Sequence, residues 1–89
     1  MKRAHVFFTG RVQGVFFRAN TQKKAIELGV NGWVKNLPDG RVEAVFEGDE
    51  LRIKDIILWC SANQPYAVVD DVKIEWEEPE GLMGFEIRS

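Results

Sequence analysis

The sequence predicts an α/β plait, in which an antiparallel sheet carries two helices on one face. Three observations indicate this fold class: the order of the apolar patterns, a Pro-Asp-Gly turn near the middle, and a length of 89 residues. A chain of this length buries roughly 60 to 65% of the surface that it exposes when unfolded, which suffices for one two-layer core. We therefore expect a single domain over residues 1–89.

The first half of the chain predicts a strand, a helix and a hairpin. Residues 3–9, RAHVFFT, alternate and are rich in β-branched and aromatic types, which is typical of a strand. Between residues 17 and 28 apolar positions recur at helical spacing, and Gly29 favours a left-handed stop. The extended runs 30–36 and 41–47 flank the Pro-Asp-Gly turn, so we expect them to pair as a hairpin.

The second half predicts another helix and two further strands. Asp49 and Glu50 favour the positive end of a helix that carries an apolar stripe and ends near Asn63. Residues 72–77 show the most regular alternation in the chain, and a short extended pattern follows at 85–87.

This order, β-α-β-β-α-β with a short C-terminal edge strand, predicts the topology. Two right-handed crossovers joined by a hairpin place the first and third strands in the middle and both helices on one face. The expected architecture is therefore a ferredoxin-like sandwich. Unrelated functions use this fold, so the function has to be argued from particular residues.

Charge and hydropathy exclude several classes of partner. The 12 Lys and Arg and 14 Asp and Glu residues give a net charge of −2, with no basic block for nucleic acid or an anionic membrane. No apolar run approaches the ~18 residues of a membrane span, and the N-terminus lacks the apolar stretch of a signal peptide. We expect a cytoplasmic protein without nucleic-acid or membrane partners.

The segment from Gly10 to Arg18, GRVQGVFFR, has the composition of an anion-binding loop. Glycines allow successive N–H groups to converge, the following helix adds about half a positive charge, and Arg18 supplies a guanidinium fork. The alternative is an ordinary strand-to-helix connection with a surface arginine, because short glycine loops are common there. No Lys-Ser/Thr pair follows Gly14, so the loop is not a Walker A sequence.

The chain strongly resembles the acylphosphatases over almost its entire length. GRVQGVFFR at 10–18 is similar to the phosphate-binding signature of that family, and GWVKNLPDGRVEAVFEG at 32–48 is similar to its second signature. Residues 63–69, NQPYAVV, depart from the family's usual Gly-Pro-Pro-Ala-Arg-Val.

The resemblance implies hydrolysis of a small-molecule acyl phosphate to a carboxylate and inorganic phosphate, without a metal or other cofactor. It implies two catalytic residues: Arg18, which binds the phosphoryl group, and Asn36, which orients the attacking water. The expected phosphate-binding residues are Arg11, Val12, Gln13, Gly14, Val15, Phe16 and Arg18. Inorganic phosphate is expected as product and inhibitor, and the protein as a monomer. An asparagine beside a turn also commonly bonds its own backbone, which is the alternative role for Asn36.

Two other reactive side chains are expected to be structural. Cys60 continues the apolar stripe of its helix, and Tyr66 occupies the position where a C-x5-R phosphatase loop needs arginine. His5 is the only histidine, which disfavours a metal site or a histidine-based triad.

Other functions of this fold require residues of their own. An RNA-recognition motif needs aromatic side chains on its third strand, where this chain has Glu43 and Glu47. A metal-carrying plait normally needs paired cysteines. A noncatalytic phosphate-binding module stays open, because the loop alone is suited to bind anions.

Overall fold

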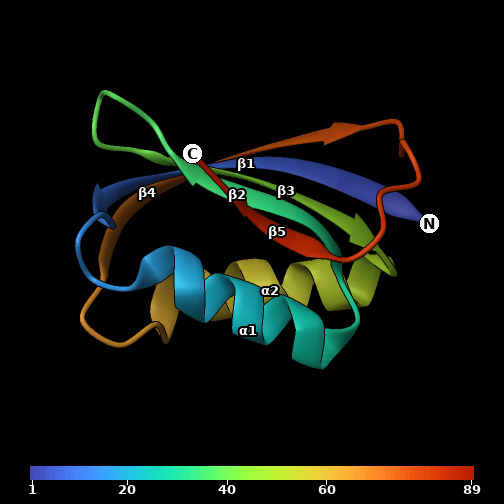
Figure 1. The fold of residues 1–89 in the computed structure, drawn as a ribbon, viewed down its shortest axis with the longest axis horizontal. Helices are drawn as coiled ribbons and strands as arrows, with labels where there is room; N and C mark the ends of the chain where they lie inside the picture. The colour runs from blue at the N-terminus through green and yellow to red at the C-terminus, as the bar shows by residue number, and fades with distance from the viewer.

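Five strands and two helices follow one another in the predicted order in the computed structural model, which describes residues 1–89. Both helices lie on one side of the sheet (Figure 1). This arrangement confirms the predicted fold class. The elements are β1 Lys2–Arg11, α1 Phe17–Leu28, β2 Asn31–Asn36, β3 Val42–Gly48, α2 Glu50–Ala62, β4 Val68–Glu77 and β5 Phe85–Arg88.

The strand order is β4-β1-β3-β2-β5, so the first and third strands are internal as expected. The four strands β4, β1, β3 and β2 pair antiparallel as expected, whereas the short edge strand β5, whose direction the sequence did not indicate, runs parallel to β2 and makes the whole sheet mixed. The reason is the return path of the chain, which crosses from β4 at one edge to β5 at the other (Figure 1). A strand of four residues carries no pattern that reveals its direction.

The strands β1 and β4 are longer than predicted, because they remain paired with each other beyond the predicted ranges 3–9 and 72–77. After a register shift between Thr9 and Gly10, the pairing continues to Arg11 and Val68. Gly10 has φ 133°, and a Cβ there would lie 2.2 Å from the carbonyl oxygen of Val68. Only glycine fits this close approach, which carries β1 directly into the loop before α1.

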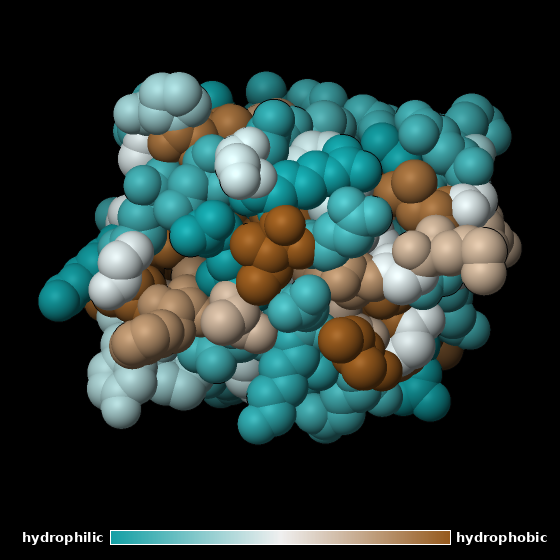
Figure 2. Space-filling view, in the orientation of Figure 1, coloured by the Kyte–Doolittle hydropathy of each residue, from teal (hydrophilic) through white to brown (hydrophobic).

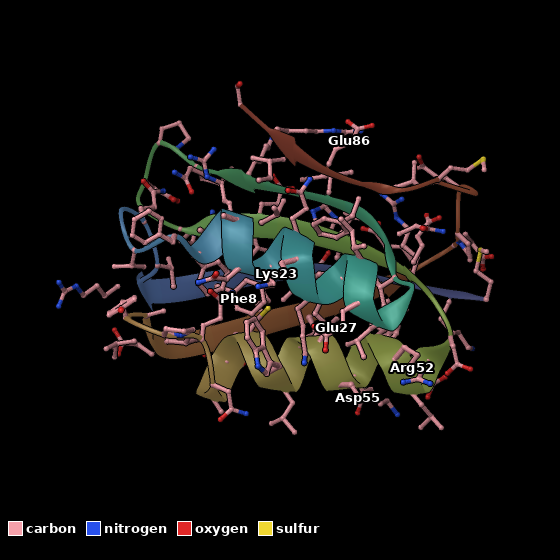
Figure 3. All side chains as sticks on the ribbon, turned by 60° about the horizontal axis from the view of Figure 1, so that its bottom comes forward. Phe8, Lys23, Glu27, Arg52, Asp55 and Glu86 are labelled. Carbon is pink, nitrogen blue, oxygen red and sulfur yellow. The ribbon has the colours of Figure 1, made fainter.

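The core lies between the helices and the sheet. Phe8 of β1 is fully buried there, beneath the helices in Figure 3. Charged side chains such as Lys23 and Asp55 lie on the outer helix faces. The expected stripe of α2 is buried and consists of Ile53, Ile56, Ile57 and Cys60.

The outer surface offers little continuous apolar area on the side shown in Figure 2, where hydrophobic residues stand singly or in small groups among hydrophilic ones. Neither helix combines the length and the apolar character that crossing a bilayer requires.

The sheet face away from the helices carries a buried carboxylate, Glu47. Its side chain accepts hydrogen bonds from Arg3 at 2.8 Å and from the backbone N–H groups of Glu80, Gly81 and Leu82 at 2.8 to 3.1 Å. Burial alone would raise the pKa of Glu47, but these donors hold its pKa below the ordinary value of 4.5. Glu47 thereby anchors the segment that connects β4 to β5.

We expect Glu47→Gln to lower the free energy of unfolding by about 1 to 2 kcal/mol at neutral pH, because an amide satisfies fewer of these donors. The pKa of Glu47 is lower in the folded protein than in the unfolded chain. Its stabilising effect is therefore complete above the unfolded pKa and is lost as the pH falls through the folded pKa. Urea unfolding of both proteins should show a stability difference that narrows as the pH falls below the ordinary carboxyl pKa.

Glu86→Gln is the control for this measurement, because Glu86 is exposed on β5. A stability loss for Glu47→Gln that stays constant across the acid range would contradict the role of the carboxylate charge.

Candidate active site

A cleft of about 300 Å³ opens at the end of the molecule where the β1–α1 loop and the end of β2 come together. The β1–α1 loop and the β2–β3 turn lie at the same end of the fold (Figure 1). The cleft therefore joins the two sequence signatures, which are separate along the chain. Its lining residues are Val12, Gly14, Phe16, Phe17, Arg18, Ala19, Asn36 and Ile87.

The loop between β1 and α1 presents unpaired backbone donors. Gly14 and Phe16 have positive φ angles of 74° and 61°. None of the main-chain hydrogen bonds outside the helices and strands is donated by an N–H of residues 12–16. These donors precede the first turn of α1, whose own N–H groups have no partner within the helix. The arrangement provides hydrogen-bond donors and a positive helix end for an anion.

Arg18 is the second residue of α1 and is half-buried at the cleft. No carboxylate lies within ion-pair distance of its guanidinium, although most other arginines of the chain are paired. Its five N–H donors remain available for an anion in the cleft.

Asn36 is the last residue of β2 and lies opposite Val42 of β3. Its Oδ1 is buried and has no hydrogen-bond partner, which is unusual for a buried polar atom. The alternative role of bonding the turn belongs to Asp39, whose carboxylate accepts from the backbone N–H of Arg41 at 3.1 Å. Asn36 thus makes no local bond that accounts for it structurally.

Gln13 connects the two halves of the site. Its Nε2 donates to the carbonyl oxygens of Leu37 and Arg41 at 2.8 and 2.9 Å, at the two ends of the β2–β3 turn. The side chain therefore ties the loop to the turn that begins directly after Asn36. From the sequence, Gln13 was expected to bind phosphate. Its two hydrogen bonds to the turn were not predicted, because nothing in the sequence indicates which groups a glutamine side chain will contact.

A second missed residue is Gln64, in the segment that departs from the family pattern. Its buried Nε2 donates to the carbonyl oxygen of Phe17 at 3.2 Å and to Oγ1 of Thr21 at 2.7 Å. These two hydrogen bonds tie Gln64 to the N-terminal part of α1. Tyr66, two residues on, has φ 67° and is exposed.

The structure brings together some of the expected phosphate-binding residues and leaves others outside the cleft. Val12, Gly14, Phe16 and Arg18 line the cleft together with Asn36. The side chains of Arg11, Gln13 and Val15 do not line it. Arg11 is exposed at the end of β1, and Val15 is buried in the core.

The other reactive side chains lie elsewhere. Burial raises the pKa of the Cys60 thiol to about 11, so it is protonated at neutral pH. His5 is held between Glu43 and Glu77 on the sheet face away from the helices, at 2.5 and 3.0 Å. No three His, Cys, Asp or Glu side chains are grouped in a way that could hold a metal ion.

The family model of the acylphosphatases matches residues 4–87, which include both the loop and Asn36. The chain belongs to the acylphosphatase family. An acylphosphatase of Nostoc sp. is 63% identical over 97% of this chain and 85% of that protein. One of Haloquadratum walsbyi is 58% identical over 97% of this chain and 92% of its own length.

A solved acylphosphatase structure from Bacillus subtilis superposes with a TM-score of 0.96 at 34% identity, covering 100% of both chains. These findings confirm the family resemblance and the ferredoxin-like fold. They also confirm that the chain is an enzyme of the acylphosphatase class of hydrolases.

Proposed function

We propose that this protein hydrolyses acyl phosphates to a carboxylate and inorganic phosphate by in-line attack of water. One observation carries the proposal: a guanidinium and a carboxamide without protein partners, those of Arg18 and Asn36, line the same cleft as the unpaired loop amides. All of these groups come from one chain, which supports action as a monomer.

The phosphoryl group binds at the loop. Backbone N–H groups of residues 12–16 donate to its oxygens, and Arg18 closes the site with a second set of donors. In phosphoryl transfer, the negative charge on the equatorial oxygens of the phosphoryl group has to be neutralised. The attacking water has to be held in line with the leaving oxygen. The loop, the positive end of α1 and Arg18 meet the first need.

Asn36 meets the second need by orienting water. Its carboxamide offers one acceptor and two donors, and a half-turn about its last torsion exchanges their places. The carbonyl accepts one hydrogen bond from the water, whose oxygen forms the new bond to phosphorus. The bond from phosphorus to the acyl oxygen breaks, and its electron pair leaves with the carboxylate. The proton lost by the water passes to a phosphate oxygen.

The leaving group explains why no strong acid is needed in the cleft. A carboxylate with a pKa near ~4 departs as the anion without protonation. The cleft lining contains no carboxylic acid, histidine or thiol, which agrees with this requirement.

We expect full hydrolysis of acyl phosphate in excess EDTA, because the charge needed at the phosphoryl group comes from Arg18 and the loop amides. Phosphate release from acetyl phosphate measures the rate, and inorganic phosphate should inhibit competitively. Activity that disappears on chelation and returns with magnesium or zinc would overturn the metal-free mechanism. Phosphate binding without phosphate release would instead identify a noncatalytic phosphate-binding module.

A further inference from the structure

Apart from Arg18 and Asn36, the side chains that line the cleft are apolar. Arg18 carries the only charge in the lining, and Asn36 is the only other polar side chain. No carboxylate and no second cation lines the cleft. The remaining lining residues are Val12, Gly14, Phe16, Phe17, Ala19 and Ile87.

Phe16 lines this cleft and is 73% exposed. It caps the N-terminus of α1 with φ 61° and ψ 22°, a left-handed conformation that bulky residues rarely adopt. Such conformations cluster at functional sites, where the surrounding structure maintains them. An exposed aromatic residue is therefore held at the cleft by a backbone conformation that is costly for a bulky side chain.

Ile87 lines the same cleft from the edge strand β5. It is 41% exposed and lies beside Val34 of β2, two residues before Asn36. Ile74 offers a close comparison, because it is 42% exposed on the other edge strand, β4, and lines a different groove. Burial and strand position are thus matched between the two isoleucines, and only Ile87 lies at the cleft.

An acyl phosphate consists of a phosphoryl group and an acyl group joined through oxygen. When the phosphoryl group lies on the loop, the acyl group has to occupy the remaining part of the cleft. We propose that Phe16 and Ile87 form an acyl-binding subsite that favours acyl phosphates with an aromatic or bulky apolar acyl group. This inference rests on the proposed function and specifies its substrate class.

The preference follows from the chemistry of the subsite. Contact with Phe16 and Ile87 removes apolar acyl surface from water, and a phenyl ring offers much more of that surface than a methyl group. We expect this difference to be worth roughly 5- to 20-fold in kcat/KM, in the range of small apolar discriminations. An acyl group with a second carboxylate is disfavoured, because no donor in the subsite replaces its lost hydration.

The test compares benzoyl phosphate, acetyl phosphate and succinyl phosphate on four proteins: wild type, Phe16→Asn, Ile87→Thr and the control Ile74→Thr. Asparagine tolerates the left-handed backbone at position 16, and threonine keeps the β-branched shape at position 87. Comparing the benzoyl-to-acetyl ratio of kcat/KM between the proteins cancels the different leaving-group reactivities of the substrates. The ratio of benzoyl to acetyl phosphate should fall roughly 5- to 20-fold in Phe16→Asn and Ile87→Thr but not in Ile74→Thr. The inhibition constant of inorganic phosphate should stay within a few fold in Ile87→Thr and Ile74→Thr, because neither residue belongs to the phosphate-binding loop.

An unchanged benzoyl-to-acetyl ratio in both cleft variants overturns the subsite while leaving acyl phosphate hydrolysis intact. Succinyl phosphate hydrolysed more efficiently than benzoyl phosphate by the wild type overturns it as well. If the wild type hydrolyses no acyl phosphate, the proposed function fails, and affinities for phenylphosphonate and methylphosphonate then decide the subsite. A phenyl preference that decreases in the two cleft variants supports the subsite, and an equal preference in all four proteins overturns it.

Discussion

Arg18→Gln is expected to lower kcat for acyl phosphate hydrolysis by about 10²-fold or more, by comparison with removal of one oxyanion donor from other enzymes. It should also weaken inhibition by inorganic phosphate, because the guanidinium meets the phosphoryl charge both before and during transfer. Arg18 has no carboxylate partner to lose, so the urea midpoint should change little. Steady-state kinetics with phosphate as inhibitor, and urea unfolding of the same preparation, measure all three effects.

Arg11→Gln is the matched control, because Arg11 belongs to the same loop signature but is exposed at the end of β1. We expect its kcat/KM to stay within a few fold of the wild-type value. Near-normal kcat/KM in Arg18→Gln together with loss of activity in Arg11→Gln would show that the wrong arginine was assigned.

Asn36→Ala is expected to lower kcat by about 10²-fold or more while inhibition by inorganic phosphate changes only a few fold. The reason is that the Asn36 carboxamide orients the water, whereas the loop amides bind the phosphate. The Asn36 side chain has no hydrogen-bond partner for Oδ1 in the structure. The stability loss should therefore be small, about 1 kcal/mol or less.

Asn31→Ala provides the comparison on the same strand, because Asn31 begins β2 and does not line the cleft. It should leave kcat unchanged. If Asn36→Ala loses stability while its folded fraction keeps the wild-type kcat, Asn36 is a turn residue. The water-orienting step would then be removed from the mechanism.

Most of the fold follows from local patterns. The alternation of β1 and the apolar stripe of α2 each depend on residues within one element, so the sequence alone predicts them. The acidic residue that caps α2 was also predictable, and Asp49 indeed accepts from the backbone N–H of Leu51 at 2.8 Å. The parallel direction of β5 and the extension of β4 back to Val68 depend on the paths of distant segments, which no local pattern records.

The candidate site divides in the same way. The glycine loop and Arg18 were identifiable because a few adjacent residue types together have a recognisable chemistry. Asn36 entered through the resemblance, since one asparagine before a turn has two equally reasonable roles. The side-chain bonds of Gln13 reach across 24 and 28 positions to Leu37 and Arg41, and only the folded structure reveals such partners. Ile87 was predicted as an edge residue, and its place at the cleft results from the pairing of β5 with β2.

The internal position of β1 affects how the chain reaches this structure. Arg3 of β1 bonds Glu77 of β4 at 3.0 Å across 74 positions of sequence, so this strand pair closes nearly the whole chain into one loop. Closing this loop costs chain entropy before the contacts between the two strands compensate for it. We therefore expect slower folding than for helical bundles of similar length. Until β4 arrives, one side of β1 exposes unpaired main-chain groups. A chain in which β1 has paired with β3 but not with β4 is therefore more prone to pair with another molecule than the folded protein is.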